Sequence, residues 1–418
     1  MQIKPVFEGK NVLPIVFAFN NDYSRYFSVA LQSLIENSND TYFYDIIVFS
    51  SDISERNKKL LKAMLPKNFN LRVFDVSEYI SNLLENVKLT TKKYWSIEMY
   101  YRIIIPLVMQ EYKKVLYVDS DVIFNNNIDK IFEIELVGKE ILAISDSFNI
   151  VANLDVSQTR NQYIREYLEL NSDNKYFNSG VIIFNISAFN SQTYITRIKN
   201  AFAKIQQTYC PDQDILNYIF KNQVKLISQK WNLQYHLPIF HKKDIPFVNQ
   251  SCLNEYFEAF KNPNIIHYTS PVKPWTDPKV ELAEIFWKYA RKTVFYEEIL
   301  SAMYKSEIFE SRYATNLYSL IQNNENIMFW GASIFLENFI KKYEIEKKYY
   351  PNILGIIDKN IARAGNVIGE YEIFTSEVLK HTKVNVIILT VINSLQERYE
   401  EVKTHLTQQN IDIKLIRL

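Results

Sequence analysis

The sequence predicts an α/β protein with a mostly parallel sheet covered by helices on both faces, then a helical linker, then a second, smaller α/β domain. Short runs rich in Val, Ile and Phe alternate along the chain with longer segments of helical spacing. The short runs are apolar at consecutive positions, which is typical of strands that are buried on both faces. At 418 residues, the chain is longer than one ordinary core supports, so we expect more than one domain.

The first domain is expected to span residues 1–280. Its strand-like runs lie at residues 13–19, 45–50, 71–76, 114–119 and 140–146. Between the first two runs, residues 24–38 place apolar side chains at helical spacing. The pattern then changes, and residues 281–322 are helical throughout, so we interpret them as the linker. After the polar run QNNEN, strand and helix patterns return, which predicts the smaller domain over residues 323–418.

Composition excludes several classes of protein. The 48 Lys and Arg residues nearly balance the 47 Asp and Glu residues, so no overall field would collect nucleic acid. The two cysteines, Cys210 and Cys252, have no CxxC spacing, which argues against a disulfide framework or a structural zinc site. No signal peptide and no run of about 18 apolar residues is evident. We therefore expect a cytoplasmic protein, at most peripheral at the inner face of the membrane.

Two segments are candidates for such a membrane contact. Residues 288–296 and 341–350 combine basic and aromatic side chains, which suit an anionic surface. Runs of this kind are more often solvated helix faces, and this alternative stays open.

The stretch KVLYVDSDVIF, residues 114–124, places Asp119 and Asp121 inside an apolar run. Side chains at i and i+2 of an extended strand project to the same side, so the two carboxylates can face one point. A divalent cation is the simplest way to offset two adjacent negative charges in a buried setting. The pair follows the apolar run, where ligands of open α/β sheets bind. The alternative is a turn or a helix cap, since Asp favours both.

The chain resembles retaining glycosyltransferase family 8 in six stretches that follow the family's order: PIVFAFNNDY, RIIIP, YVDSDVIF, NSGVIIFN, DQDILN and HYTSPVKPW. The resemblance covers about residues 13–276. The family includes bacterial lipopolysaccharide galactosyl- and glucosyltransferases and the glycogenins. The resemblance implies a GT-A fold, a nucleotide-sugar donor and Mn²⁺, with Mg²⁺ as the second choice.

The resemblance also implies a metal site. Asp119 and Asp121 match the family's DxD, and His267 matches the third protein ligand. Two carboxylates and one imidazole leave coordination positions for diphosphate oxygens, and the imidazole favours Mn²⁺ over Mg²⁺. Taken alone, His267 would more often be a structural histidine, but its place in HYTSPVKPW favours the ligand role.

The positions that match the family's donor-binding residues are Ala18, Asn20, Asp22, Tyr23, Arg102, Asp119, Ser120, Asp146, Asn178, Ser179, Asp212, Gln213 and Lys273. The catalytic candidates among them are Gln213, Asp212, Lys273 and Arg102. By resemblance, Gln213 faces the reacting carbon, while Lys273 and Arg102 offset charge on the leaving UDP. We interpret Asp214 and Asn217 as helix-capping and locally hydrogen-bonded residues instead.

The chain departs from the family's pattern in two places. It has NNDY where many bacterial relatives have DDNY, but the side-chain carbonyl of Asn20 can still accept the uracil N3–H. It has Ser270 and Pro271 where relatives usually have Gly-Ser, and Pro271 offers no N–H to a phosphate.

The resemblance predicts a retaining transferase that moves a hexose from a UDP-sugar, either UDP-glucose or UDP-galactose. The expected acceptor is a glycan or a lipid-linked glycan in bacterial surface polysaccharide or lipopolysaccharide synthesis. Double displacement needs a carboxylate nucleophile beneath the anomeric carbon, and Gln213 is a poor one. We therefore expect a front-face mechanism in which the departing diphosphate helps to deprotonate the acceptor. The oligomeric state stays open.

Two alternative functions remain. A protein that binds a nucleotide-sugar without turnover would be expected to lose a metal ligand or Lys273, and this chain has them all. A nucleotidyltransferase would be expected to carry a glycine-rich phosphate loop after the first strand, which is missing here.

The C-terminal segment IMFWGASIFLENFI, residues 327–340, indicates a strand, a glycine and a helix. Asp358 follows the next strand, 27 positions after Gly331. This is a partial dinucleotide-binding pattern without the GxGxxG glycines. It resembles Rossmann-like modules attached to some bacterial sugar-modifying enzymes. Between nucleotide binding and a docking, dimerisation or acceptor-positioning role, we favour the second.

Overall fold

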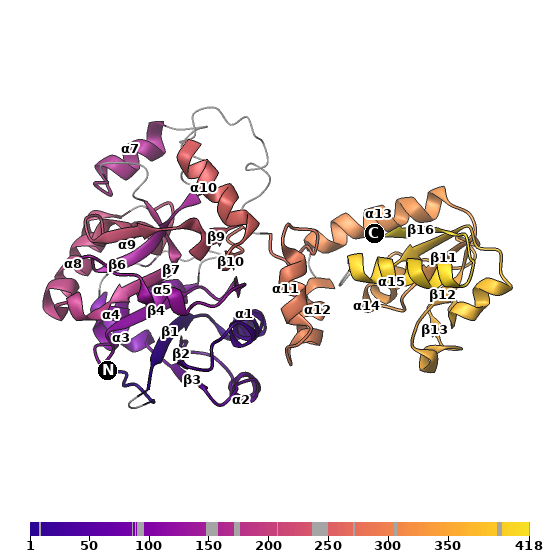
Figure 1. Ribbon diagram of the computed structural model, residues 1–418. Helices are drawn as coiled ribbons and strands as arrows, with labels where there is room; N and C mark the ends of the chain where they lie inside the picture. Colours follow the sequence, from indigo (N-terminus) through magenta and orange to yellow (C-terminus); the bar gives the residue numbers. More distant parts are fainter. Residues whose placement is uncertain are drawn as a thin grey trace. The chain divides into compact units, whose positions relative to one another are not determined.

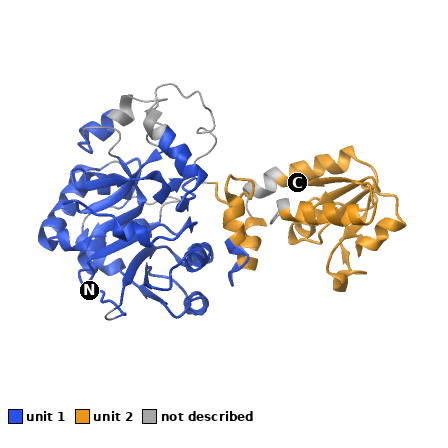
Figure 2. Ribbon diagram, viewed as in Figure 1, with its two compact units in different colours: residues 1–271, 289–295 blue, residues 272–288, 296–418 orange. Residues whose placement is uncertain are grey.

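The computed structural model describes residues 1–7, 10–85, 87, 89, 96–147, 158–170, 176–206, 208–235, 250–270, 272–304, 307–390 and 395–417. The chain forms two compact units (Figure 2). The first comprises Met1–Pro271 and Tyr289–Phe295, and the second comprises Val272–Lys288 and Tyr296–Leu418. The domain boundaries expected at residues 280 and 322 stay predictions.

A seven-stranded sheet forms the centre of the first unit, in the order β3-β2-β1-β4-β7-β6-β8. Its strands are β1 (Val12–Ala18), β2 (Phe43–Phe49), β3 (Phe69–Phe74), β4 (Lys114–Val118), β6 (Ile141–Ser145), β7 (Phe177–Asn185) and β8 (Val224–Ile227). Only β7 runs antiparallel to its neighbours, β4 and β6, among these pairs. The predicted mostly parallel sheet is confirmed, and all five expected strand runs fall on its strands.

Helices cover both faces of this sheet (Figure 1). They are α1 (Ser24–Glu36), α2 (Glu55–Ala63), α3 (Ser77–Leu83), the 3₁₀ helix η2 (Ile97–Ile104), α4 (Ile105–Val108), α5 (Asp129–Glu133), α7 (Gln158–Glu166), α8 (Ser191–Lys204), α9 (Pro211–Ile219) and α10 (Gln250–Lys261).

Alternate side chains of the strands point to opposite faces, as strand geometry requires. Val16 and Tyr117 belong to the core that also holds residues of η2, α8 and α9. Phe17, next to Val16, points the other way and meets Phe27 of α1, with ring centroids 4.8 Å apart. Both faces of the strands are therefore buried, which explains their consecutive apolar residues.

Three short strands form a second sheet in the first unit, in the order β5 (Val122–Phe124), β10 (Ile265–His267), β9 (Leu233–Gln234). In this sheet β10 lies antiparallel to β5 and parallel to β9. His267 is paired with Val122 on one side and with Gln234 on the other. This register brings His267 next to the segment that carries the paired acids, although the two are far apart in sequence.

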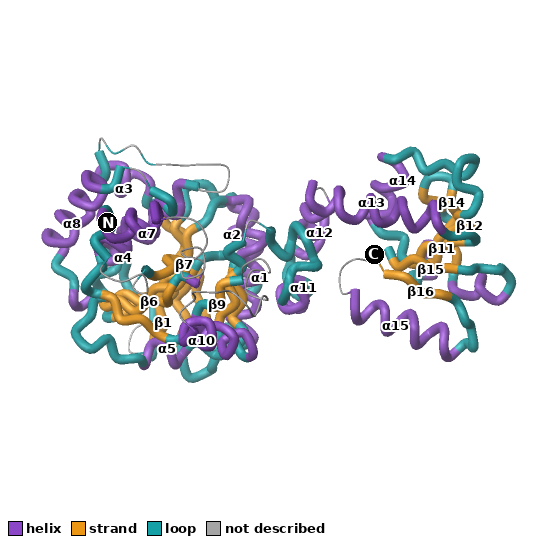
Figure 3. The backbone as a smooth tube through the Cα atoms, turned by 90° about the horizontal axis from the view of Figure 1, so that it is seen from above, coloured by secondary structure: helices purple, strands orange, loops and turns teal. Residues whose placement is uncertain are grey.

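The second unit contains a six-stranded sheet in the order β13-β14-β12-β11-β15-β16. Its strands are β11 (Ile327–Trp330), β12 (Ile353–Ile357), β13 (Val367–Ile368), β14 (Tyr371–Phe374), β15 (Val386–Leu389) and β16 (Lys414–Arg417), and the described pairs are parallel except β13 with β14. The helices after residue 281 are α11 (Ala283–Ala290), α12 (Tyr296–Tyr304), α13 (Glu307–Asn323), α14 (Ile334–Lys342) and α15 (Leu395–Gln408), drawn in Figure 3. None of the helices in the described part of the chain has the length and apolar character that crossing a bilayer needs.

Candidate active site

Asp119, Asp121 and His267 form one cluster beyond the carboxyl end of β4. One ligand atom from each residue lies within 4.8 Å of the others. The Nε2 atom of His267 is 3.2 Å from Asp121 Oδ1 and 3.6 Å from Asp119 Oδ2. The imidazole is buried, whereas both carboxylates are partly exposed. Three metal-ligating atoms thus converge at a point that the solvent reaches from the carboxylate side.

Backbone hydrogen bonds fix this cluster. The Asp119 N–H donates to Gly180 O at 2.8 Å, which extends the pairing of β4 with β7 beyond the end of β4. The Tyr268 N–H donates to Asp121 O at 3.0 Å, which ties the turn between β4 and β5 to the end of β10. The positions of both acids are therefore set by main-chain pairing with neighbouring strands.

Gly180 keeps the space between the imidazole and the first carboxylate clear. A Cβ atom at this position would lie 2.2 Å from His267 Cε1 and 2.7 Å from Asp119 Oδ2. Neither distance is physically tolerable, so a side chain here would displace two of the three ligands. Two carboxylates and one imidazole around a clear space fit a divalent cation.

Arg102, in η2, supplies a positive charge beside the cluster. Its Nη2 lies 2.9 Å from Asp119 Oδ1, its Nε lies 3.2 Å from Asp212 Oδ2, and its Nη1 donates to Ser179 O at 2.7 Å. Burial acts to lower the pKa of Arg102, but the carboxylates of Asp119 and Asp212 outweigh it and raise that pKa above its ordinary value. The guanidinium is therefore a permanent cation between two acids.

Tyr117 is a contact of the cluster that the sequence did not single out. Its hydroxyl donates to Asp119 Oδ1 at 2.7 Å, and the Arg102 guanidinium lies 4.5 Å from the centroid of its ring. Burial raises the pKa of Tyr117 well above its ordinary value, so the hydroxyl stays protonated and remains a donor. Asp119 Oδ1 is thus held by Tyr117 and Arg102, while Oδ2 faces His267. In the sequence Tyr117 stands two residues before Asp119, but this spacing alone does not identify the contact.

The predicted sugar-binding residues form one buried network around Gln213. The Gln213 Nε2 donates to Asp146 Oδ2 at 2.8 Å, and its Oε1 accepts from Ser179 N at 3.0 Å and from Asn178 Nδ2 at 3.1 Å. Gln213 lies in the first turn of α9, Asp146 follows β6, and the other two lie in β7. Three segments distant in sequence therefore converge on the Gln213 amide.

Asp212 lies beside this network, and its Oδ2 contacts two protein groups. Its Oδ2 accepts from the Ser179 hydroxyl at 3.0 Å in addition to its ion pair with Arg102. Burial raises the pKa of Asp212 above its ordinary value, although the nearby Arg102 acts in the opposite direction. The carboxylate is thus bound on the protein side.

Asn232 is a second residue that sequence reasoning missed. It follows the 3₁₀ helix η5 (Gln229–Trp231) and is fully buried. Its Nδ2 donates to Asn178 Oδ1 at 2.8 Å, and its Oδ1 lies 2.9 Å from His267 Nδ1. It therefore joins the Gln213 network to the acid–histidine cluster. The segment around it carries no chemical motif, so one sequence offers no signal for this role.

The residues predicted at the uridine lie after β1. Ala18 ends that strand, and Asn20 caps the 3₁₀ helix η1 (Asn21–Tyr23) by accepting from Tyr23 N at 3.2 Å. Asp22 is exposed. Burial, followed by the negative charge of Asp121, raises the pKa of Tyr23 well above its ordinary value. Of these four residues, the structure brings Tyr23 beside the paired acids.

Two further positions, Ser120 and Lys273, complete the predicted set. Ser120, between the two acids in sequence, is buried. Lys273 belongs to the second unit, in a turn where the N–H groups of Thr276 and Asp277 donate to its carbonyl at 2.9 Å each. Its contact with a donor diphosphate stays a prediction. Pro271 lies outside the described residues.

Asp214 and Asn217 have the structural roles that we predicted. The Asp214 Oδ2 accepts from the N–H groups of Tyr209 and Cys210, at 2.8 and 3.1 Å. The side chain of Asn217 accepts from Phe177 N at 2.9 Å and donates to Phe177 O at 2.8 Å. Together they hold the start of α9 against β7, which positions the neighbouring Gln213.

The model of the family described as "Glycosyl transferase family 8" matches residues 14–279. This range is more than half of the chain and holds the whole site described above. The chain belongs to glycosyltransferase family 8. It is accordingly a glycosyltransferase, and the prediction of that enzyme class is confirmed.

Individual glycosyltransferases, among curated proteins and solved structures, are also similar to this chain. Glycosyltransferase GlyB of Streptococcus pneumoniae is 24% identical over 329 residues, which cover 76% of this chain and 72% of GlyB. Lipopolysaccharide 1,2-glucosyltransferase of Escherichia coli is 22% identical over 276 residues, which cover 65% of this chain and 75% of that enzyme. The structure of galactosyltransferase LgtC with donor and acceptor sugar analogs has a TM-score of 0.53 and 22% identity, covering 68% of this chain and 96% of LgtC. This likeness confirms the GT-A fold.

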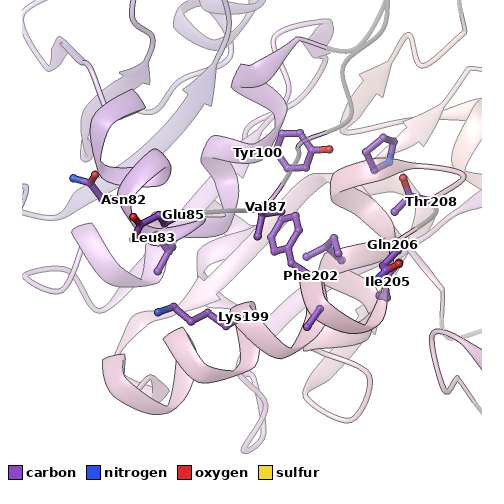
Figure 4. Close-up of a pocket in the computed structure, with 13 residues that line it drawn as sticks. Asn82, Leu83, Glu85, Val87, Tyr100, Lys199, Phe202, Ile205, Gln206 and Thr208 are labelled. Atoms are coloured by element: carbon purple, nitrogen blue, oxygen red, sulfur yellow. The ribbon is translucent and has the colours of Figure 1, made fainter.

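A separate pocket of about 700 Å³ lies on another side of α9 in this family 8 domain (Figure 4). The rings of Tyr100 and Phe202 line it, with centroids 6.1 Å apart. The other lining residues are Asn82, Leu83, Glu85, Val87, Lys199, Ala203, Ile205, Gln206, Thr208, Pro211 and Ile215. Apolar and polar groups thus alternate around a cavity that lies outside the acid–histidine cluster.

The turn after β11 in the second unit is closed by its own residues. The Ala332 N–H donates to Asp358 Oδ2 at 2.8 Å, and Arg363 Nη1 donates to Ala332 O at 2.5 Å. The Thr390 hydroxyl donates to Gly331 O at 2.6 Å. Asp358, predicted as a possible ribose contact, is therefore bound to the turn itself.

Proposed function

We propose that this family 8 glycosyltransferase moves a hexose from a UDP-sugar, UDP-glucose or UDP-galactose, to a glycan or lipid-linked glycan acceptor in bacterial surface polysaccharide or lipopolysaccharide synthesis, at the cytoplasmic face of the membrane. The observation that carries the proposal is the convergence of two sets of groups at one sheet edge. The Asp119–Asp121–His267 cluster is suited to a diphosphate with its cation, and the Gln213 network is suited to a sugar.

Asp119, Asp121 and His267 would hold a divalent cation, Mn²⁺ in preference to Mg²⁺. When bound, such a cation offsets the negative charge of the donor diphosphate and of the leaving UDP. Gly180 supports this role because it leaves the space between His267 and Asp119 clear.

Arg102 would act through the carboxylates. Its Nε also donates to Met99 O at 2.9 Å, so the three nitrogens of its guanidinium all contact protein atoms. It orients Asp119, as a metal ligand requires, and offsets the charge of Asp212. Lys273 would supply the cation that contacts the diphosphate directly, as the resemblance implies.

The environment of Gln213 supports a front-face reaction with retention of configuration. Its amide is fixed by Asp146, Asn178 and Ser179 and offers no nucleophile. The adjacent carboxylate, Asp212, is bound by Arg102 and by the Ser179 hydroxyl. Double displacement needs a carboxylate held directly against the anomeric carbon. A departing diphosphate oxygen would instead take the proton of the acceptor hydroxyl on the same face.

A donor screen tests this function. The full chain is incubated with Mn²⁺ and with UDP-glucose, UDP-galactose or their N-acetyl forms, and the released UDP is measured together with the anomeric configuration of the product. We expect UDP release from one of the hexose donors and an α-linked product from the α-linked donor. Inversion of configuration would contradict the mechanism. Pyrophosphate release from a nucleoside triphosphate would instead establish a nucleotidyltransferase, and tight donor binding without turnover would establish a binding protein.

For the second unit, we propose a Rossmann-like module with a docking, dimerisation or acceptor-positioning role. The strand order β14-β12-β11-β15-β16, with β11 at the point where the order reverses, supports the fold. The closed turn at Gly331 and Ala332 supports a role other than nucleotide binding.

A further inference from the structure

We infer that Asn232 is a positioning residue that sets the tautomer of His267, so that the Nε2 lone pair faces the cation site. The inference rests on the metal site of the proposed function and goes beyond it, because it assigns the proton on the imidazole and the residue that controls it. The observation behind the inference is a chain of hydrogen bonds in which backbone N–H groups of β7 fix which atom donates and which accepts.

The chain begins at two backbone donors. The Gly180 N–H donates to Asn178 Oδ1 at 3.0 Å, and the Ser179 N–H donates to Gln213 Oε1 at 3.0 Å. A backbone N–H can only donate, so each of these side-chain atoms is an oxygen. The remaining end of the Asn178 amide is then its Nδ2, which donates to Gln213 Oε1 at 3.1 Å. The orientations of both amides are therefore fixed by main-chain atoms.

Asn232 connects the Asn178 amide to the imidazole, and its own orientation is fixed by Asn178. Its amide approaches Asn178 Oδ1 at 2.8 Å, and because that oxygen only accepts, the approaching atom is Nδ2. The Asn232 Oδ1 is then the atom that lies 2.9 Å from His267 Nδ1. A carbonyl oxygen only accepts, so His267 Nδ1 carries a proton, and in the neutral imidazole Nε2 is the nitrogen with the lone pair.

The opposite tautomer is strongly disfavoured here. It would set the Asn232 carbonyl against the Nδ1 lone pair at 2.9 Å, with both atoms acceptors. Asn232 is fully buried and His267 is 3% exposed, so solvent is not available to compensate. In the tautomer that we infer, the lone pair of Nε2 lies on the side of Asp121 and Asp119, 3.2 and 3.6 Å away, where a cation would bind.

The same chain reaches the sugar end of the site. From Asn178 it continues to Gln213 Oε1, and Gln213 Nε2 donates to the Asp146 carboxylate. Every amide step runs in one direction, from His267 toward Asp146. Asn232 thus joins the ligand of the cation to the residue expected under the reacting carbon, and a change at Asn232 affects both.

The first test reads the tautomer directly in the metal-free full chain. Histidine is labelled with ¹⁵N, long-range ¹H–¹⁵N spectra are recorded, and the His267 signals are assigned by their loss in His267→Gln. We expect a proton on Nδ1, donated to the Asn232 carbonyl. An Nδ1 without a proton would overturn the inference. This readout needs no sugar donor, so its outcome is independent of whether the proposed transfer is observed.

Two substitutions at Asn232 sharpen the test. Asn232→Leu has the same shape but no acceptor for Nδ1–H, so the tautomer preference should be lost and Mn²⁺ affinity, measured by calorimetry with UDP present, should fall about 10- to 100-fold. Asn232→Asp still accepts from Nδ1–H but no longer donates to Asn178. It should keep the tautomer and Mn²⁺ affinity, while donor turnover falls. Wild-type Mn²⁺ affinity in Asn232→Leu would contradict the inference.

Asn217→Leu is the matched control. Asn217 is equally buried and also bonds to β7, through Phe177, but its side-chain hydrogen bonds go to Phe177 and to Gln213 O and not to His267. It should lower the thermal stability of the protein and leave the His267 tautomer unchanged. If both leucine variants changed the tautomer alike, the effect would be one of general packing and the inference would be wrong.

Discussion

Asp119 and Asp358 each directly follow a strand, but their carboxylates have different surroundings. Asp119 follows β4 in the first unit, and its Oδ2 faces His267 across a clear space. Asp358 follows β12 in the second unit, where its Oδ2 accepts from Ala332 N and its Oδ1 accepts from Asn360 N at 2.8 Å. An acid at the carboxyl end of a strand is thus a candidate metal ligand in the first unit, whereas in the second unit it holds the adjacent turn closed.

The surroundings explain the difference. In the first unit, a glycine without room for a Cβ and a histidine from a distant strand leave one oxygen of Asp119 directed at a shared point. In the second unit, the adjacent turn donates its own N–H to Asp358. The N–H of Ser333 donates to Gly331 O, and the N–H of Leu336 donates to the Ser333 hydroxyl. Three of the N–H groups around this helix start, those of Ala332, Ser333 and Leu336, therefore already donate within the protein.

The largest expected effect separates the two aspartates directly. Asp121→Ala or Asp119→Ala removes a carboxylate of the cluster and should lower donor turnover on the order of a thousand-fold. Asp358→Ala is the matched control and should leave turnover near that of the wild type. UDP release with Mn²⁺ measures both. Near-normal turnover of Asp121→Ala would show that the acid–histidine cluster has no role in catalysis.

The next effect compares two arginines that pair with these aspartates. Arg102→Met leaves Asp119 and Asp212 without their buried cation, and should lower the free energy of unfolding by about 3 kcal/mol. Arg363→Met, whose side chain is 45% exposed and 3.8 Å from Asp358, should lower it by less than about 1 kcal/mol. Urea unfolding of the full chain, followed by probes in each unit, measures both. If both variants lost the same free energy of unfolding, burial would not explain a difference between the Arg102 and Arg363 ion pairs.

A smaller effect is expected at Gly180. The Cβ of Gly180→Ala would push His267 and Asp119 apart, and a displacement of about 1 Å in an active site lowers the rate about a hundredfold. The far-ultraviolet circular dichroism should stay that of the folded protein, since the added methyl group meets ligand side chains rather than the main chain. If turnover were unchanged in a folded Gly180→Ala protein, the space beside His267 would have no role in catalysis.

The smallest effect concerns the second unit. Calorimetric titration of the full chain with NAD(H) should give no heat, because the turn at Gly331 and Ala332 is closed by Asp358 and Thr390. Binding that is lost in Asp358→Ala but kept in Asp121→Ala would show that the crevice opens for a nucleotide. Asp358 would then be a ligand-binding residue, which is the role that we assign to Asp119 and not to Asp358.

Much of the fold and part of the site followed from the sequence. Runs of consecutive apolar residues predicted the parallel strands because burial on both faces leaves that pattern. The paired acids and His267 followed from ordered motifs that the family shares. The three-stranded sheet that joins them could not be predicted. A strand as short as β10, which has three residues and ends at His267, is too brief to show a periodic pattern.

Tyr117 and Asn232 could not be predicted for a related reason. Their roles depend on which atom of one buried side chain faces which atom of another, as in the 2.9 Å approach of Asn232 to His267. A single sequence carries residue types and spacing, whereas such contacts arise from the packing of segments far apart. The opposite uses of Asp119 and Asp358 are a further case, because both follow the same local pattern.

The most direct test of the account is a calorimetric titration of the full chain with Mn²⁺ in the presence of UDP. The account predicts one Mn²⁺ bound per chain, with binding abolished in Asp121→Ala and unchanged in Asp358→Ala. A wild-type chain that binds no Mn²⁺, or an Asp121→Ala protein that binds it as the wild type does, would contradict the account.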